Sequence, residues 1–437
     1  MSRLSRLAAT ATVAALTLLV SGPASAGEPT ISDPRVVAYF DFTTGEAPEN
    51  IALEPDGSAN LTLASARQVV RVGKQGEVLP VATLPAVTNP HTPILGAAVV
   101  MGIVRAHDGT LYVNYATGTS ETGIWRIGPH GAAPAQIAQL PVDGLPNGLA
   151  LDEERGVFYV ADTARGIVWR VPQAGGTPTA WATGTALEPL PEADGFQAGA
   201  NGIKVHNGDV WVSNTDRKTL LRIPVRHDGS AGTIETRATG LDWIDDFAFT
   251  GHDDTVLATL TMANQVALVH PDGTHEIVLT ERDGLSNPTA VAVRDKRDEH
   301  DKRDEHNKRD DRGERGEGDH RDESDGRGER DDRGEREDRH DRDDRDRRDD
   351  GDKHDEGDRR DDGDKHDEGD RRDDGDKHDE GDHRDDGDKH DEGDHRDDGD
   401  KRDAYAKTVY VTSASYFATQ KDPNLLLGRL HEGNDQP

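Results

Sequence analysis

One pattern constrains the fold more than any other: a unit of four short apolar strands recurs six times along the chain. Each unit begins with a lead-in strand in a common register, and these strands read PENIAL (48–53), VMGIVR (100–105), PNGLAL (146–151), ANGIKV (200–205), IDDFAF (244–249) and SNPTAV (286–291). Their second residues lie 52, 46, 54, 44 and 42 positions apart. Because evenly spaced strands without helical periodicity are typical of radial β-repeats, the sequence predicts an all-β, six-bladed β-propeller.

The two ends of the chain complement each other in this repeat. The sixth unit ends before its fourth strand, whereas an unmatched strand, RVVAYFDF (35–42), precedes the first unit. We expect this N-terminal strand to supply the missing outer strand of the last blade and so to close the ring. Closure would cover the strand edges of a chain that contains no cysteine and therefore forms no disulfide.

A charged segment interrupts the sixth unit. Residues 296–403 contain 51 acidic and 30 basic side chains and no apolar one, so they carry -21 of the chain's net charge of -34. Within them a twelve-residue repeat, GDKHDEGDRRDD (351–362), recurs with little change. A segment with nothing to bury is predicted to be disordered. Since strands PTAVAVRD (288–295) and AKTVYVTSAS (406–415) flank it, we expect a long insertion in a hairpin loop.

The first residues have the pattern of an export signal. Arg3 and Arg6 precede an apolar run (7–20) and a small-residue cleavage site, ASA (24–26). The run is too short to span a membrane comfortably, so we expect a signal peptide over 1–26 and a secreted, extracellular, monomeric protein without a membrane partner. The expected plan is then 27–295 for blades one to five and the start of blade six, 296–403 for the insertion, and 404–437 for the rest of blade six and the C-terminal tail.

The second position of the lead-in strands holds the candidate functional residues. In a propeller this strand lines the central channel, so the residues at its start converge on one axis. Around the ring they are Glu49, Met101, Asn147, Asn201, Asp245 and Asn287. All except the methionine carry oxygen donors. Carboxylate and amide oxygens without cysteine or histidine suit a hard divalent cation, Ca²⁺ above all, and argue against zinc.

An alternative interpretation concerns the Asn-Gly pairs. Asn147-Gly148 and Asn201-Gly202 are favoured turn dipeptides, so each asparagine could simply reverse the chain before a strand. The register that these residues share with the carboxylates of other units favours the metal site over recurrent turns. In the preferred interpretation Asn147 contributes a carbonyl oxygen, and Gly148 keeps the turn role that lets the chain enter the strand.

With a Glu in the first unit, PNG in the third, NG in the fourth and Asp-Asp in the fifth, the chain resembles the regucalcin and gluconolactonase family and its relatives, the paraoxonases and diisopropyl fluorophosphatase. The resemblance covers about residues 35–430 apart from the insertion. It implies a six-bladed propeller with a divalent metal in the channel. By position the implied ligands are Glu49, Asn147, Asn201 and Asp245, with Asp246 as a further candidate and Asn50 and Asn287 as weaker ones.

The resemblance also implies an activity. A metal in the channel would serve hydrolysis of a lactone, ester or phosphoester, with Asp245 as catalytic base or nucleophile. Two alternatives stay open: a non-catalytic propeller that binds a sugar, peptide or cell-wall ligand, and a metal-assisted lyase on the same fold. The expected partner is a small-molecule substrate or sugar ligand. Nucleic acid is not expected, because the sequence has no basic aromatic surface and no phosphate-binding loop.

Two further features have structural or functional interpretations. Trp243, two residues before Asp245, is expected either to form a wall of a substrate pocket or to pack between blades. An arginine recurs in the third strand of five units and is expected to brace neighbouring blades. These arginines are Arg71, Arg126, Arg170, Arg222 and Arg429.

Overall fold

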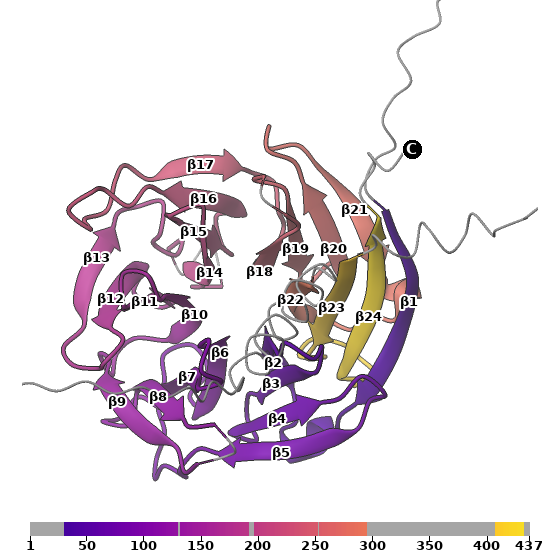
Figure 1. Cartoon of the computed structure of the whole chain (residues 1–437), viewed down its shortest axis with the longest axis horizontal. Helices are drawn as coiled ribbons and strands as arrows, with labels where there is room; N and C mark the ends of the chain where they lie inside the picture. The colour runs from indigo at the N-terminus through magenta and orange to yellow at the C-terminus, as the bar shows by residue number, and fades with distance from the viewer. Residues whose placement is uncertain (1–29, 130–131, 192–195, 252, 295–406, 432–437) are drawn as a thin grey trace, which may run out of the picture. The chain divides into compact units, whose positions relative to one another are not determined.

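Six four-stranded antiparallel sheets make up the described chain, and Figure 1 shows them arranged around a central axis. The computed structural model describes residues 30–129, 132–191, 196–251, 253–294 and 407–431. These ranges belong to one of two compact units, residues 1–310 with 397–437, and the other unit, residues 311–396, lies outside them. The predicted six-bladed propeller is therefore confirmed.

Five blades are consecutive in the sequence, each running from its innermost to its outermost strand. Blade one contains β2 (Pro48–Leu53), β3 (Ala59–Leu63), β4 (Gln68–Val72) and β5 (Val78–Thr83). Blade two contains β6 (Val99–Arg105), β7 (Leu111–Ala116), β8 (Gly123–Ile127) and β9 (Ala135–Gln139). Blade three contains β10 (Pro146–Asp152), β11 (Val157–Asp162), β12 (Ile167–Pro172) and β13 (Thr179–Thr183). Blade four contains β14 (Ala200–His206), β15 (Asp209–Asn214), β16 (Thr219–Ile223) and β17 (Glu235–Ala238), and blade five β18 (Ile244–Phe249), β19 (Val256–Leu260), β20 (Gln265–Val269) and β21 (His275–Thr280).

The sixth blade joins the two ends of the chain. It contains β22 (Pro288–Arg294), β23 (Lys407–Ser413) and β24 (Asn424–His431), with β1 (Thr30–Tyr39) as its outermost strand. Figure 1 shows indigo β1 beside yellow β24, and the two strands pair antiparallel from Thr30–His431 to Tyr39–Asn424. The predicted closure by an N-terminal strand is confirmed, although the strand begins earlier and ends before the predicted position 42.

The predicted signal peptide (1–26) and charged insertion (296–403) lie outside the described residues. The strands that flank the insertion are described, and they are neighbours in one sheet. Arg294 at the end of β22 pairs with Thr408 in β23. The chain therefore leaves and re-enters the last blade within a single hairpin, as predicted.

Two short 3₁₀ helices complete the described structure. They are η1 (Phe42–Thr44) and η2 (Glu281–Asp283), and each ends at a glycine in the left-handed conformation, Gly45 and Gly284. Nowhere in the described ranges is a helix long and apolar enough to cross a membrane.

The apolar core lies between the blades. One buried cluster joins Tyr159 of blade three to Val212 of blade four, and another joins Phe247 of blade five to Trp211 of blade four. Equivalent clusters join the remaining neighbours, including the sixth blade to the first through Tyr410 and Leu61. Because strand side chains alternate between the two faces of a sheet, every blade can bury both faces against its neighbours.

Two of the recurrent third-strand arginines form direct ion pairs within their own blades and not with a neighbouring blade as expected. Arg71 forms an ion pair with Glu54 of its own blade. Arg222 does the same with Asp209 and Glu235. Asp209 lies on the second strand and Glu235 on the fourth strand of the sheet of Arg222, whereas Glu54 directly follows the first strand of the blade of Arg71.

Candidate metal centre

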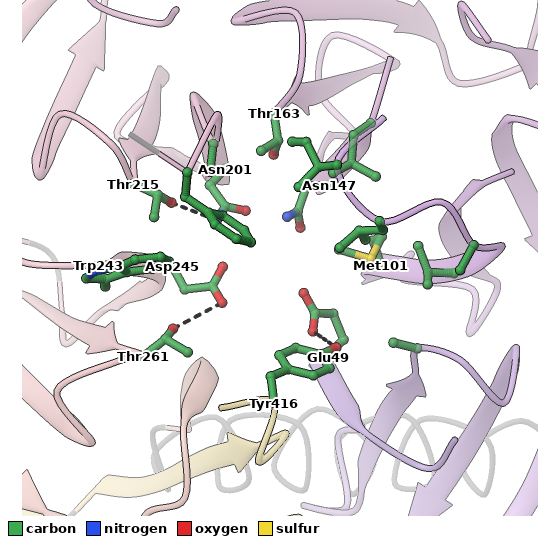
Figure 2. Close-up of a pocket in the computed structure, with 18 of the residues that line it drawn as sticks. Glu49, Met101, Asn147, Thr163, Asn201, Thr215, Trp243, Asp245, Thr261 and Tyr416 are labelled. Atoms are coloured by element: carbon green, nitrogen blue, oxygen red, sulfur yellow. Dashed lines mark hydrogen bonds between the residues drawn. The ribbon is translucent and has the colours of Figure 1, made fainter. Parts of the chain in front are cut away.

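Four of the predicted ligands line one cavity of about 330 Å³. Figure 2 shows the side chains of Glu49, Asn147, Asn201 and Asp245 approaching a common centre from four different blades. The first three of these residues are only 5 to 7% exposed. The sequence register therefore brings together the residues that it predicts to meet.

A β-bulge in the innermost strand positions each of these side chains. In β10, Asn147 and Gly148 together lie opposite the single residue Ala161. Such a bulge bends the strand and changes the direction in which its side chains point. The corresponding irregularities in the other blades contain Glu49 in β2, Asn201 in β14 and Asp245 in β18.

Gly148 is needed for the close approach of the next blade. A Cβ atom at this position would lie 2.4 Å from the carbonyl oxygen of Asn201. A Cβ atom added at Gly102 of blade two would likewise lie 2.4 Å from the carbonyl oxygen of Asn147. The turn role expected for Gly148 is therefore wrong, and so is the alternative of a turn at the Asn147-Gly148 pair, because both residues lie inside β10 and the glycine makes room for neighbouring backbone. Local sequence does not separate the two cases, since a bulge depends on the partner strand.

Hydrogen bonds between neighbouring blades hold the backbone of the candidate ligands. Asn114 of blade two donates from Nδ2 to the carbonyl oxygen of Asn147, at 2.8 Å. Ser213 of blade four donates from Oγ to the carbonyl oxygen of Asp245, at 2.5 Å. Asn114, Ser213 and Asn147 are buried and Asp245 is partly buried, so the ring of candidate ligands has little freedom to spread.

The amide of Asn201 presents an unpaired oxygen. Thr215 uses its hydroxyl hydrogen in a 2.8 Å bond to the carbonyl oxygen of Ile244, so its oxygen accepts from Nδ2 of Asn201 at 2.9 Å. This arrangement fixes the orientation of the amide. The Oδ1 atom of Asn201 is buried and has no hydrogen-bond partner among the described residues. A bound ion would satisfy such an atom.

The two carboxylates are held differently. Glu49 accepts a 2.5 Å hydrogen bond at Oε2 from the hydroxyl group of Tyr416, and Figure 2 shows this pair at the edge of the site. Thr261 lies 3.3 Å from Oδ2 of Asp245, but its hydroxyl is closer to the carbonyl oxygen of Pro288, at 2.8 Å. The hydrogen bond to the carboxylate of Asp245 is therefore longer and weaker than the one to the carboxylate of Glu49.

Burial and the charges of neighbouring carboxylates disfavour the ionised form of both Glu49 and Asp245. Burial raises the pKa of Glu49 to about 7, against the opposing effect of the Tyr416 hydrogen bond. Burial, followed by the charges of Glu49 and Asp246, raises the pKa of Asp245 well above its ordinary value. No lysine, arginine or histidine is among the described residues that line the cavity. A cation between the two carboxylates would supply the missing positive charge.

The donor set fits a hard divalent cation. Two carboxylates and the amide carbonyls of Asn147 and Asn201 are the oxygen ligands that Ca²⁺ prefers, and the flexible coordination of Ca²⁺ leaves room for water or substrate. Within the described ranges no group of three or more His, Cys, Asp or Glu side chains is placed to hold a metal. A centre built only of such groups is thus not found there, and amide oxygens have to complete the candidate site.

Asp246, also predicted as a ligand, lies apart from this group. It does not line the cavity, and its carboxylate accepts hydrogen bonds of 2.6 and 2.7 Å from Nζ of Lys204. It also accepts a 3.2 Å hydrogen bond from the amide of Asn50, another weak candidate. The alternation of β18 explains the separation, because consecutive residues in an extended strand point in opposite directions. Asp246 and Asn50 thus satisfy one another and Lys204.

The remaining two ring positions do not supply cavity ligands. Asn287 bonds through Nδ2 to the carbonyl oxygen of Thr261 and accepts at Oδ1 from the backbone N–H of Phe417, so its amide is already paired. Met101 is buried in a small apolar cluster with Val99 and Leu145. The predicted oxygen ligands that line the cavity therefore come from four blades.

Sequence reasoning missed Tyr416, the partner of Glu49, and three threonines that line the cavity. Tyr416 follows the insertion, far from Glu49 in the chain, and no local pattern marks it. The threonines do have a signal, since each follows directly after the second strand of its blade. They are Thr163, Thr215 and Thr261.

The outer part of the cavity is apolar. Trp243 lines it, as one of the two interpretations of the sequence proposed, together with Phe196 and Phe417. Ile94 and Leu95, from the loop between β5 and β6, also line it. The cavity therefore combines an oxygen-rich base with an aromatic and aliphatic wall.

No protein-family model matches the sequence, and no curated protein matches it either. Among solved structures, the chain is similar to virginiamycin B lyase from Staphylococcus aureus, with 14% identity, a TM-score of 0.41 and coverage of 61% of this chain and 93% of the lyase. It is similar to the calcium-binding protein regucalcin from Agrobacterium tumefaciens, with 15% identity, a TM-score of 0.43 and coverage of 59% and 82%. A nutrient-binding protein from Bacteroides thetaiotaomicron has 9% identity, a TM-score of 0.43 and coverage of 56% and 64%. Membership of the regucalcin and gluconolactonase family stays a prediction.

Proposed function

We propose that this protein is a secreted, divalent-metal-dependent hydrolase that uses Ca²⁺ and acts on a lactone, ester or phosphoester. The observation that carries the proposal is the meeting of two buried carboxylates with an unpaired amide oxygen, without a basic side chain among the described residues of the cavity wall. Ca²⁺ bound there would polarise a carbonyl or phosphoryl oxygen of the substrate and stabilise the charge that develops on it.

The residues of the chain have distinct roles in this proposal. Asp245, whose carboxylate has the weaker hydrogen bond, accepts a proton from the attacking water. Asp245 also holds the cation, together with Glu49, which Tyr416 fixes, and the amides of Asn147 and Asn201. The apolar wall excludes water from around the bound substrate, which strengthens the electrostatic interactions at the base of the cavity.

Metal analysis of the purified protein tests the metal site. The wild-type protein should hold one Ca²⁺ per chain, and Glu49→Gln and Asp245→Asn should each lower the affinity for Ca²⁺ at least a hundredfold. Asp143→Asn is the matched control, because this carboxylate lies outside the cavity and its side chain is 69% exposed. Unchanged Ca²⁺ binding in both site variants would refute the site.

Turnover of a panel of lactones and aryl esters tests the hydrolase. Activity should disappear on addition of a chelator and return with Ca²⁺, and Asp245→Asn should stay inactive even when Ca²⁺ is saturating. A decrease of about three orders of magnitude in kcat is the usual scale for loss of a general base with its electrostatic effect.

One observation favours a second candidate, a non-catalytic propeller that binds a small ligand. The described residues of the cavity include no histidine or lysine that could transfer a proton. Met101 occupies one of the ring positions with an apolar side chain. Under this candidate, chelation lowers the melting temperature but no substrate in the panel is turned over.

A further inference from the structure

The wall of the cavity contains a group of exposed apolar side chains. Ten large apolar side chains are exposed in the described chain, and four of them line this one cavity. A concentration of this kind is characteristic of a binding surface rather than of scattered surface residues. The four are Ile94, Leu95, Phe196 and Phe417, which are 38 to 46% exposed.

Three aromatic rings form a corner on one side of the cavity. The ring centres of Phe196 and Trp243 lie 5.3 Å apart, those of Trp243 and Phe417 5.9 Å apart, and those of Phe196 and Phe417 6.2 Å apart. Their planes are inclined by 52 to 84° to each other. A corner of inclined rings offers both a face and an edge to another aromatic ring, which are the contacts that such rings prefer.

The propeller holds this aromatic corner in place through polar bonds. The backbone N–H of Phe196 donates to Oδ1 of Asp216 at 3.0 Å, and the backbone N–H of Phe417 donates to Oδ1 of Asn287 at 2.8 Å. The backbone carbonyl of Trp243 accepts from the backbone N–H of Thr261 at 3.1 Å. The rings are thus presented by fixed backbone and not by chance exposure of a loose loop.

Two cavity residues have unfavourable backbone conformations. Trp243 has φ of 59° and Ile94, which is β-branched, has φ of 68°. A bulky residue in the left-handed region is strained, and such strain is concentrated at functional sites. The strained backbone presents Ile94 and Trp243 to the same cavity.

We infer that the ligand of this cavity is an uncharged ester or lactone that carries an aromatic ring, with the ring in the corner of Phe196, Trp243 and Phe417. This inference rests on the proposed function, because the carbonyl group is assigned to the oxygen-rich base. The hydroxyl groups of a sugar lactone would instead meet an apolar wall, where few partners are available and desolvation is costly. The cavity volume of about 330 Å³ is in the range of small-molecule sites.

Equilibrium binding of stable amides separates this ligand class from the others. In calorimetry with saturating Ca²⁺, 3-phenylpropanamide should bind at least tenfold more tightly than gluconamide, a polyhydroxylated carbonyl compound of similar length. Phe196→Ala and Phe417→Ala should each weaken binding of the phenyl compound on the order of tenfold. Leu79→Ala is the matched control, since this exposed apolar side chain lies on β5 outside the cavity and its loss should change nothing.

The outcomes of this experiment are independent of catalysis. Equal or tighter binding of gluconamide, or unchanged affinity of the phenyl compound in both phenylalanine variants, overturns the aromatic ligand class. The Ca²⁺ affinity of each variant is measured in parallel. If the wild-type protein binds the phenyl compound selectively but no Ca²⁺, the aromatic pocket stands and the proposed metal-dependent function fails.

Discussion

The hydroxyl group of Tyr416 donates a 2.5 Å hydrogen bond to Oε2 of Glu49, although 367 positions separate the two residues in the chain. Glu49 belongs to the first blade, and Tyr416 follows the second strand of the last blade. The ring closure that makes these blades neighbours thus also places a donor on the buried carboxylate. The bond opposes the effect of burial on the pKa of Glu49.

Replacing Tyr416 by phenylalanine should weaken the metal site without removing it. The loss of a hydrogen bond to a carboxylate raises the pKa of Glu49 further, so that protons compete better with Ca²⁺ near neutral pH. We expect the Kd for Ca²⁺ to rise roughly tenfold at pH 7, as measured by calorimetry.

Tyr410→Phe is the matched control for this variant. Its hydroxyl donates a 2.9 Å hydrogen bond to the carbonyl oxygen of Gly57, away from the cavity. This change should lower the free energy of unfolding by about 1 kcal/mol and leave the affinity for Ca²⁺ unaltered. Equal Ca²⁺ affinities of the two variants would show that Tyr416 does not support Glu49.

Gly148→Ala should damage both stability and metal binding. The added methyl group would lie 2.4 Å from the carbonyl oxygen of Asn201, so one of the two blades has to move. We expect the free energy of unfolding to fall by about 2–4 kcal/mol and Ca²⁺ affinity to fall with it. In Gly156→Ala the added atom meets open space at φ of 62°, and only a cost of about 1 kcal/mol without loss of Ca²⁺ affinity is expected. Chemical denaturation and calorimetry measure the two effects.

The metal-free protein should lose stability as the pH rises from about 4.5 to about 7. Burial raises the pKa of Glu49 from its ordinary 4.5 to about 7, so the folded state keeps a proton that the unfolded state releases in this window. Stability is therefore highest below the unfolded pKa and declines up to the folded one, by an amount on the order of a few kcal/mol.

Denaturation curves from pH 4 to 8 measure this decline. Glu49→Gln should make the decline smaller in the metal-free protein, since one of the two carboxylates with a raised pKa is gone and Asp245 remains. Saturating Ca²⁺ should reverse it in the wild-type protein, because the cation binds the ionised carboxylates. If the metal-free wild-type protein instead becomes more stable over the same pH window, the pKa of Glu49 is not raised in the folded state. Glu49 would then not be buried without a compensating positive charge.

Lys204→Met should destabilise the fold while leaving Ca²⁺ stoichiometry intact. The substitution removes the partner of Asp246, whose side chain is 3% exposed, and leaves a buried carboxylate. The free energy of unfolding should fall by about 2–4 kcal/mol, and the second change Asp246→Leu should restore part of it.

Lys218→Met provides the comparison for this ion pair. Its partner is Asp242, and both side chains are more than half exposed, so the cost should stay below about 1 kcal/mol. If Lys204→Met is fully folded but no longer binds Ca²⁺, Asp246 belongs to the metal site.

Deletion of residues 296–403 should leave a folded propeller. Arg294 and Thr408 pair across the hairpin of the last blade, so the few residues that remain between them suffice for a loop. The deleted protein should have the same β-sheet circular dichroism and Ca²⁺ affinity as the full chain. Failure of a soluble deletion variant to show a cooperative unfolding transition would refute the hairpin insertion.

The sequence by itself determined the architecture and the register of the ring. Strand patterns have a period of two, and here they recur in units of about the same length, so six blades, their innermost strands and the closing N-terminal strand could all be predicted. The shared register also predicts that Glu49, Asn147, Asn201 and Asp245 meet at the channel axis. These features depend on local alternation and on repetition, which a single sequence displays.

Only the tertiary structure decided how the ring positions divide their roles. Whether Asn147-Gly148 makes a turn or a bulge depends on the partner strand, and whether Asp245 or its neighbour Asp246 faces the cavity depends on that bulge. The contribution of Tyr416 to Glu49, and of Phe196 and Phe417 to the aromatic corner, depends on which loops meet at the end of the channel. Contacts of this kind join distant segments, and their geometry is set by packing between blades rather than by the residues on either side in the chain.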